Sequence, residues 1–420
     1  MYPVKFVREN LELLKAAASA KNQTVSWTRL ETLEVERRKL LVQLEDIKRR
    51  QNELTAQISS LKRQKQDTAS LQTQAGRLAD EALPHQSSLV LLEQEINDLI
   101  SSIPNIPHES VPVSKDASAN IVVRTWGDIS KPDFNVLPHD EIGGRLGILD
   151  LARGAKITGS SFPVFRGNGA LLVRALINFM LDLHRKNGFN EAWVPALVNR
   201  ASLFGTGQLP KLEEDMYRLK DDDFFLIPTA EVPVTNLHRD EVIPSGDLPL
   251  YYAAYTPCFR REAGAYGKDT KGLIRLHQFD KVEMVKFVRP EESYNELETL
   301  VQEAERVLQA LELPYRVVLL ASGDMSFAAS KCYDLEVWAP GIQRWLEVSS
   351  CSNFEAFQAR RANIRYRNKK GAAEHVHTLN GSGVAFPRTI IGILENHQQK
   401  DGTVRVPDVL RPYMNDLKFL

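Results

Sequence analysis

The sequence predicts an α+β protein in two parts, an N-terminal helical hairpin over residues 1–110 and a larger body over residues 111–420. Two observations lead to this division. In the first part, leucine and isoleucine recur at alternating steps of three and four, which is the spacing of a coiled-coil seam. In the second part, mixed helix and strand signals continue to the end of the chain, and about 300 residues can form a single body.

The bulk composition excludes several classes of protein. The chain has 420 residues, of which 25% are charged, and a net charge of -1, so a nucleic-acid partner would have to be bound by a local basic patch. Cys258, Cys332 and Cys351 are too few and too scattered for a disulfide framework. No apolar run approaches the roughly 18 residues of a membrane span, and the first ten residues lack a signal-peptide core. We therefore expect a cytoplasmic protein with no membrane partner.

The hairpin is predicted to be an antiparallel coiled coil with a turn at residues 67–70. The seam of the first leg is formed by Leu30, Leu33, Arg37, Leu40, Leu44, Ile47, Gln51, Leu54, Ile58 and Leu61. The seam of the second leg is formed by Leu78, Leu89, Leu92, Ile96, Leu99 and Ile103. Pro84 lies within the second leg, where a proline removes a backbone hydrogen bond, so we expect a kink or a break there.

Charge is divided unevenly between the two legs. Residues 37–65 contain nine lysines or arginines and three acids, whereas residues 71–103 contain one arginine and five acids. The basic leg could pair with the acidic leg across the coiled coil, or it could present a basic edge to a phosphate backbone. Both interpretations can hold at different heptad positions.

The richest chemistry in the body lies in residues 256–287, which we expect to form two strands joined by a glycine-rich loop at 263–272. Strand alternation would place side chains from both strands on one ligand. The expected set is two arginines, two carboxylates and one ring: Arg260, Glu262, Arg275, Phe279 and Glu283. The loop contains two lysines and would suit a mobile basic flap over an anion. The alternative is an ordinary hairpin with exposed charges.

Three further patterns carry polar groups. In IPTAEVPVTN, the Thr229 hydroxyl and the Glu231 carboxylate would share a strand face, and the carboxylate could bind an ammonium group. In WLEVSS, Glu347 and Ser350 offer the hard oxygen ligands that Mg²⁺ accepts, although an exposed strand is the alternative. Residues 377–398 read as a strand, a glycine-rich turn and an amphipathic helix that Arg388 opens.

These motifs, in this order, resemble the seryl-tRNA synthetases of bacterial type, a family of class II aminoacyl-tRNA synthetases. The Phe-Arg-x-Glu strand and the Arg-x-x-x-Phe strand are similar to the second class II signature. The helix expected at 170–186, followed by a strand at 189–194 and Pro195, is similar to the first signature, and the region of Arg388 to the third. The resemblance implies that the body is an antiparallel sheet flanked by helices and that the protein is a homodimer.

The same resemblance implies a ligase that activates L-serine with ATP and Mg²⁺, without zinc, and transfers the seryl group to the 3' end of tRNA(Ser). The implied serine-binding residues are Thr229, Ala230, Glu231, Glu283 and Ser382. The implied ATP-binding residues are Arg260, Arg261, Glu262, Arg275, Phe279, Glu347, Val348, Ser349, Ser350 and Arg388. Among these, Arg260 and Arg388 would be catalytic, and Glu347 and Ser350 would hold Mg²⁺.

For the arm, the resemblance implies contact with the long variable arm of tRNA(Ser). The implied tRNA-binding residues are Arg37, Arg38, Lys48, Arg49, Lys62 and Arg63. Whether tRNA(Sec) is also charged stays open. The chain departs from the family pattern at Pro387, where glycine is usual, and at Ala356, where aspartate is common; proline is tolerated in a first helical turn, so the helix is still expected.

Three other interpretations stay open. The chain could be a synthetase-like paralogue with a binding or regulatory role, or a ligase that charges a carrier protein. The coiled coil could also be a structural dimerisation rod on an unrelated enzyme.

Overall fold

The computed structural model describes residues 1–129, 132–263 and 271–420, and the chain forms two compact units. The first unit comprises residues 1–19 and 23–103. The second comprises residues 20–22 and 104–420. None of the helices in the described part of the chain is long and apolar enough to cross a membrane.

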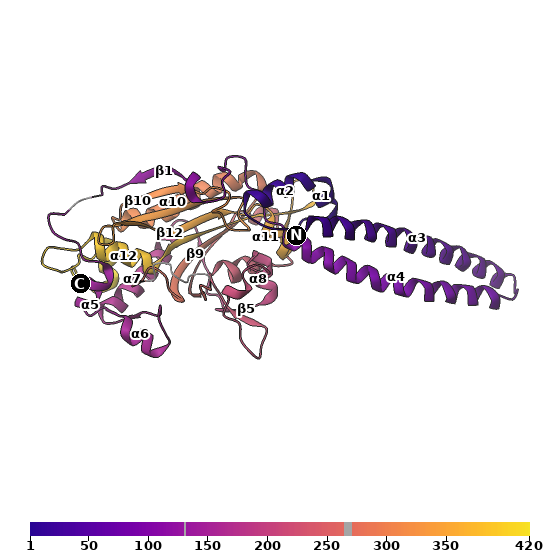
Figure 1. The fold of residues 1–420 in the computed structure, drawn as a ribbon, viewed down its shortest axis with the longest axis horizontal. Coiled ribbons are helices and arrows are strands. Elements are labelled where there is room, and N and C mark those ends of the chain that lie inside the picture. The colour runs from indigo at the N-terminus through magenta and orange to yellow at the C-terminus, as the bar shows by residue number, and fades with distance from the viewer. Residues whose placement is uncertain (130–131, 264–270) are drawn as a thin grey trace. The chain divides into compact units, whose positions relative to one another are not determined.

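The first unit is helical, and its two long helices run side by side as a hairpin (Figure 1). Its helices are α1 (Val4–Glu9), α2 (Leu11–Ala20), α3 (Trp27–Arg63) and α4 (Ala69–Ser101). The 37 residues of α3 span about 55 Å at a rise of about 1.5 Å per residue. Every residue predicted for the seam is buried or half-buried, whereas most positions between them are exposed. The predicted coiled-coil hairpin is therefore confirmed.

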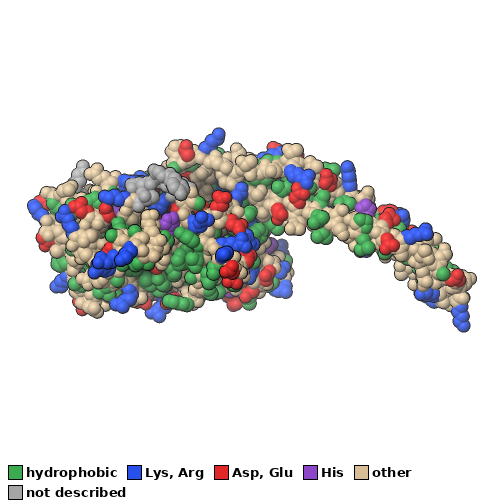
Figure 2. Space-filling model, turned by 60° about the horizontal axis from the view of Figure 1, so that its bottom comes forward, with side chains coloured by type: hydrophobic (Ala, Val, Ile, Leu, Met, Phe, Trp, Pro, Cys, Tyr) green, Lys and Arg blue, Asp and Glu red, His purple; other side chains and the backbone are tan. Residues whose placement is uncertain are grey.

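Part of the uneven charge is used within the hairpin. Cross-leg ion pairs join Arg29 to Glu95 at 2.7 Å, and join Arg37 to Glu93 and Arg50 to Glu81 at 3.0 Å each. Figure 2 shows both signs of charge interspersed along this arm. Water and salt screen exposed pairs of this kind, so they define the register of the two legs more than they stabilise the hairpin.

Other basic side chains of the arm lie outside these cross-leg pairs. Arg49 pairs with Asp46 and Glu53 of its own helix. Lys48, Lys62 and Arg63 are exposed and form no ion pair with another residue that the structure describes. The basic leg therefore contains residues that pair with the acidic leg and others that are available to a phosphate backbone.

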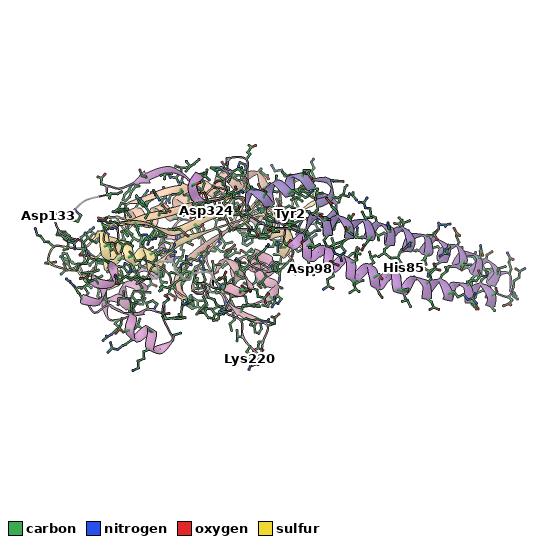
Figure 3. All side chains as sticks on the ribbon, in the orientation of Figure 1. Tyr2, His85, Asp98, Asp133, Lys220 and Asp324 are labelled. Atoms are coloured by element: carbon green, nitrogen blue, oxygen red, sulfur yellow. The ribbon has the colours of Figure 1, made fainter. Side chains whose placement is uncertain are left out.

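The break expected at Pro84 does not occur. Helix α4 continues from Ala69 to Ser101 with Pro84 inside it, and the ribbon is unbroken beside His85 (Figure 3). Pro84 lies on the exposed side of the helix, where water can solvate the backbone carbonyl that has lost its amide partner. The predicted break is therefore wrong, because an interior proline weakens a helix without ending it when the seam still packs. The kink, which was the other expected outcome, stays a prediction.

The second unit is built on an eight-stranded sheet with the order β1-β10-β11-β12-β15-β9-β8-β4. All neighbours are antiparallel except β4 and β8. In that order the strands are Ile121–Trp126, Tyr315–Leu319, Lys331–Ala339, Arg344–Asn353, His377–Ala385, Gln278–Val288, Leu250–Phe259 and Asn190–Glu191. This confirms the antiparallel-dominated sheet that the resemblance implied.

Helices cover the sheet and bury its central strands. The main core packs α7 (Asn168–Lys186), α10 (Ser293–Ala310) and α12 (Phe386–Asn396) against one face. A second cluster, which includes Val285 and Phe287, covers the other face. Strand β9 is therefore buried on both sides over its second half, and its odd-numbered face leads from Phe279, Lys281 and Glu283 directly into this second cluster.

Short elements complete the second unit. The helices are α5 (His139–Arg145), α6 (Leu151–Ile157), α8 (Arg200–Thr206), α9 (Glu231–Thr235) and α11 (Phe357–Ala362). The small sheets pair β2 (Leu149–Asp150) with β3 (Val164–Phe165), β5 (Leu197–Asn199) with β6 (Phe224–Leu226), and β13 (Arg365–Arg367) with both β14 (Ala373–His375) and β7 (Val242–Ile243).

Pro84→Ala should stabilise α4 by up to about 3 kcal/mol, because alanine restores the missing amide donor and removes the ring clash. Gly76→Ala in the same helix is the matched control, since its added methyl group meets no atom within 4 Å, and it should gain only about 1 kcal/mol. Amide hydrogen exchange of α4 in the full-length chain measures both gains. A gain at Pro84 no larger than that at Gly76 would contradict this account.

Candidate active site

A pocket of about 610 Å³ lies in the second unit, lined by strands β9, β11, β12 and β15, by the loop that follows β8 and by the first turn of α12. All but two of the residues predicted for the body site line it. They are Thr229, Glu231, Arg260, Glu262, Arg275, Phe279, Glu283, Glu347, Val348, Ser349, Ser350, Ser382 and Arg388. Ala230 is fully buried at the start of α9 and Arg261 is exposed, and neither is among the lining residues.

The five side chains expected to converge from residues 256–287 do so, but strand alternation does not explain it. Strand β8 ends at Phe259 and β9 begins at Gln278, so Arg260, Glu262 and Arg275 lie on loop segments. The chain leaves the sheet because the amides of Arg261 and Ala263 donate to the backbone and side-chain oxygens of Asp215, both at 2.9 Å.

Glu262 then turns the chain with a left-handed φ of 51°, a conformation that non-glycine residues rarely adopt. Its carboxylate forms an ion pair with Arg275, which ties the outgoing limb of the loop to the returning limb. Residues 264–270, most of the expected basic flap, lie outside the described residues.

Three arginines form a cationic part of the pocket lining. The guanidinium of Arg260 lies 5.2 Å from the ring centre of Phe279, a cation–π contact, and its Nε donates to the Pro228 carbonyl at 3.4 Å. Arg388 donates from Nη1 to the backbone oxygen of Glu347 at 2.8 Å and lies 3.3 Å from its carboxylate. Arg275 is paired with Glu262 as described. Each cation is thus already placed by an acceptor or a ring, which suits the recognition of an anionic ligand.

Two buried carboxyl groups also line the pocket. Glu283 is 1% exposed; it accepts from Asn380 at 2.8 Å and forms an ion pair with Lys281. Glu231 is 7% exposed and accepts from the Gln358 side chain at 2.6 Å.

Burial raises the pKa of Glu231 to about 7, and the charge of Glu283 adds to the rise. The Gln358 hydrogen bond and the charges of Lys281 and Arg260 oppose it. A carboxylic acid that is largely protonated below neutral pH therefore faces the pocket and would gain from a cationic partner.

The segment of Thr229 and Glu231 is not a strand, so that part of the prediction was wrong. Glu231 begins helix α9, and the Thr229 hydroxyl accepts from the Glu231 amide at 3.2 Å. A threonine just before a helix and a proline in its first turn both favour this start, and Pro233 occupies that turn here. Lys281 donates to the same hydroxyl at 2.9 Å, which brings Thr229 beside the ion pair of Lys281 with Glu283.

A bulge in β12 accounts for the joint exposure of Glu347 and Ser350. Because Glu347 and Ser350 are three residues apart, their side chains would point to opposite faces of a regular strand. The ladder to β11 shifts register between Leu335 and Glu336, so both Glu347 and Ser350 line the pocket.

Opposite Ser350 on β11 lies Asp334, whose pKa is raised well above its ordinary value by burial and by the charge of Glu347. Within the described ranges, no group of three or more His, Cys, Asp or Glu residues is placed to hold a metal ion.

The glycine-rich turn expected in residues 377–398 is instead part of β15, which continues through Gly381 and Gly383 to Ala385. A Cβ on Gly381 would lie 2.8 Å from the Cys351 sulfur, and one on Gly383 would lie 2.8 Å from the His184 ring. These glycines therefore allow the strand to pack closely on its neighbours. The helix after them forms as expected, with Pro387 in its first turn.

Sequence reasoning missed several polar residues of the pocket region, among them Lys281, Gln358, Asn380 and Asp334. Lys281 had a usable signal, because it lies between Phe279 and Glu283 at the strand period of two. Asn380 lies two residues before Ser382 and had the same signal. Gln358 and Asp334 come from separate elements, and no local pattern marks them.

An antiparallel sheet with this pocket, together with a match of residues 214–397 to the class II tRNA synthetase core domain (G, H, P, S and T), defines a class II aminoacyl-tRNA synthetase. Residues 1–107 match the seryl-tRNA synthetase N-terminal domain. The serine–tRNA ligase of Thermodesulfovibrio yellowstonii is 52% identical over 99% of both chains, and that of Caldicellulosiruptor bescii is 55% identical with the same coverage.

Among solved structures, the seryl-tRNA synthetase of Pyrococcus horikoshii complexed with ATP superposes with a TM-score of 0.93 at 36% identity, covering 100% of this chain and 99% of that one. The chain therefore belongs to the seryl-tRNA synthetase family.

Proposed function

We propose that this chain is a serine–tRNA ligase, which activates L-serine with ATP and transfers the seryl group to the 3' end of tRNA(Ser). The observation that carries the proposal is a single pocket lined both by two buried carboxyl groups, Glu231 and Glu283, and by three arginines, Arg260, Arg275 and Arg388. A ligand that suits this lining carries an ammonium group and phosphates. Serine and ATP together meet this description.

In the activation step, an oxygen of the serine carboxylate attacks the α-phosphorus of ATP. The bond from that phosphorus to the bridging oxygen breaks, and pyrophosphate leaves with the electron pair. Negative charge develops on phosphate oxygens, so preorganised cations supply most of the stabilisation. We assign Arg260 to the serine carboxylate and the α-phosphate, and Arg275 and Arg388 to the outer phosphates. Phe279 would stack on adenine, and the remaining predicted ATP contacts stay proposals.

Glu347 and Ser350 would hold Mg²⁺, with Asp334 as a further oxygen ligand nearby. The donor set fits, since all three are hard oxygen ligands, and the raised pKa of Asp334 indicates a carboxyl group that would gain from a cation. When bound, the ion would help to neutralise negative charge on the phosphates. The chain's own arginines act beside it.

The Glu231 carboxylate would bind the ammonium group of serine, and Glu283 would accept a hydrogen bond from the serine hydroxyl. Thr229 and Ser382 would lie beside them. A pocket built for a hydroxyl rejects an alanine substrate by a factor of roughly 10⁴ where its buried groups would be left unpaired. Asn380 and Lys281 already fix the Glu283 carboxylate, which supports this role.

The transfer step requires tRNA, which we assign to the arm at residues 1–110, with the catalytic domain at 111–420. RNA helices are recognised mainly by shape and backbone, for which a long, rigid, partly basic hairpin is suitable. The exposed Lys48, Lys62 and Arg63 are the strongest candidates for phosphate contact. Charging of tRNA(Sec) is a further possibility for the same surface.

We also propose that the protein is a homodimer. Trp193 is 84% exposed and lies within the segment that resembles the first class II signature, and Ile157, which is 74% exposed, ends helix α6. Large apolar side chains with this exposure favour a covered surface.

Arg260→Ala should reduce serine-dependent ATP–pyrophosphate exchange by at least about 10³-fold, because the central cation of the transition state is lost. Arg306→Ala is the matched control, since it removes an arginine that is 51% exposed on α10, and it should leave the exchange unchanged. Exchange rates at saturating serine and ATP measure the effect. A folded wild-type chain without any exchange would rule out a ligase and favour a paralogue.

A triple change of Lys48, Lys62 and Arg63 to glutamate should raise KM for tRNA(Ser) by about tenfold or more, because three phosphate contacts become repulsive. Pyrophosphate exchange should be unchanged. A tRNA without its variable arm is the control and should be charged equally poorly by both proteins. Equal charging of intact tRNA by the two proteins would remove the arm from tRNA recognition.

A further inference from the structure

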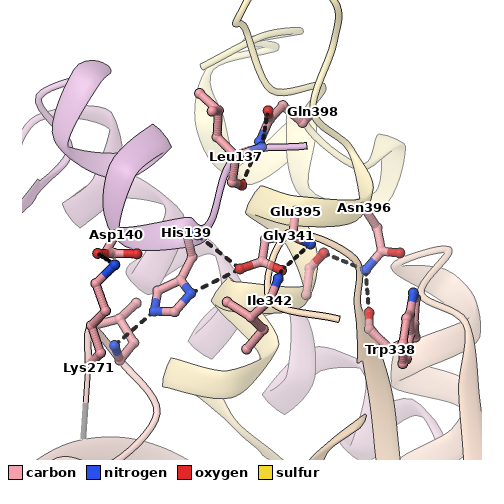
Figure 4. Close-up of polar contacts among 12 residues, drawn as sticks. Leu137, His139, Asp140, Lys271, Trp338, Gly341, Ile342, Glu395, Asn396 and Gln398 are labelled. Carbon is pink, nitrogen blue, oxygen red and sulfur yellow. Dashed lines mark hydrogen bonds and ion pairs between the residues drawn. The ribbon is translucent and has the colours of Figure 1, made fainter. Parts of the chain in front are cut away.

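A buried carboxylate outside the pocket is fixed from four directions. Glu395, near the end of α12, is 1% exposed. One of its oxygens accepts from the backbone amide of His139 at 2.9 Å and from the ring Nδ1 of His139 at 3.0 Å. The other accepts from the amides of Gly341 at 2.8 Å and Ile342 at 3.2 Å (Figure 4). A carboxylate so fully hydrogen-bonded is a fixed point of the fold.

His139 connects this fixed point to the loop that carries Arg275. The ring is 1% exposed, and its Nε2 accepts from the amide of Leu273 at 3.1 Å. Because Nδ1 faces a carboxylate and Nε2 faces an N–H donor, the ring is neutral with its proton on Nδ1. Both ring nitrogens are therefore used, one toward α12 and one toward the loop.

The loop segment is shaped to receive the ring. Gly272 has a φ of 67°, and a Cβ there would lie 2.2 Å from Nε2 of His139, so a side chain at 272 would block the contact. Two residues after Gly272, the backbone carbonyl of Ile274 accepts a hydrogen bond from Nε of Arg388 at 3.3 Å. Helix α12 thus holds two successive residues before Arg275, one directly through Arg388 and one through His139.

These two contacts have different fates when ATP binds. Arg388 is assigned to the phosphates, so its bond to the Ile274 carbonyl competes with the nucleotide. The hydrogen bond from the Leu273 amide to His139 does not compete with the nucleotide, because the other ring nitrogen of His139 is bound to the carboxylate of Glu395. It can hold the returning limb in place while Arg388 serves the ligand.

We propose that His139 is a positioning residue for nucleotide binding, which relays the fixed position of Glu395 to the amide of Leu273 and so places Arg275. The inference rests on the proposed ligase function. The alternative is a core histidine that only joins α5 to α12. That role would affect stability and the amount of active protein, without a preference between the two small substrates.

Two near-isosteric variants separate the two ends of the relay. His139→Asn keeps a donor near the position of Nδ1 but leaves the Leu273 amide without an acceptor. His139→Gln keeps an acceptor near the position of Nε2. Glu141→Ala is the control on the same helix, because it removes an exposed ion pair with Arg145. The readout is serine-dependent ATP–pyrophosphate exchange, with KM determined separately for ATP and for serine.

His139→Asn should raise KM for ATP about tenfold, the effect of one lost buried hydrogen bond, and leave KM for serine within about twofold. His139→Gln and Glu141→Ala should stay within about twofold of wild type for both substrates. Equal rises in both KM values, or a His139→Gln variant as impaired as His139→Asn, would overturn the proposal. Absence of exchange in the wild-type protein would instead refute the ligase function itself.

Amide hydrogen exchange of the wild-type chain decides the case if the asparagine variant does not fold. The Leu273 amide should be strongly protected, and protection should persist when ATP is added. Rapid exchange at Leu273, with or without ATP, would overturn the proposal.

Discussion

The pocket depends on keeping two carboxylates and one ammonium group out of water at one end of β9. Ion pairs at such depth are stable only when every charge is also hydrogen-bonded. Lys281 and Glu283 lie on the same face of β9 and pair with each other, and Asn380 from the adjacent β15 supplies a further donor. Glu231 comes from α9 and receives Gln358 from α11. Four separate elements thus supply the three ionisable groups and the partners that they need.

The cationic part of the pocket is organised differently. Its arginines sit on loop segments and at the start of α12, and their partners, such as Glu262 and Glu347, are partly exposed. Pairs of this kind are weak and can be exchanged for phosphate oxygens at little cost. The part of the pocket around Glu231 and Glu283 is therefore rigid, and the part around Arg275 and Arg388 can rearrange. Contacts behind the arginines, such as that of His139 with Leu273, decide how far this rearrangement goes.

Much of this arrangement could be predicted from the sequence, and the exceptions share a cause. The coiled-coil seam followed from heptad spacing alone, because every seam residue packs against its own hairpin. The convergence of the five side chains on the pocket was predicted, but from strand alternation, which does not apply at Glu262. That residue lies in a loop with a left-handed φ, which follows from hydrogen bonds of its neighbours to distant Asp215. The bulge that brings Glu347 and Ser350 to one face depends on the register with β11. The helical start at Glu231 was readable from Thr229 and Pro233, whereas Gln358 and Asp334 required the tertiary fold.

The central claim is that burial raises the pKa of the Glu231 carboxyl group in the free protein and that the ammonium group of serine lowers it again. Its raised pKa of about 7 predicts the sign: below that pH the binding of serine must release a proton. Calorimetric titration with serine in buffers of different ionisation enthalpy measures this directly. We predict release approaching about one proton per serine near pH 6, release falling towards zero above about pH 8, and none in Glu231→Gln. Serine binding at pH 6 without proton release would contradict the account.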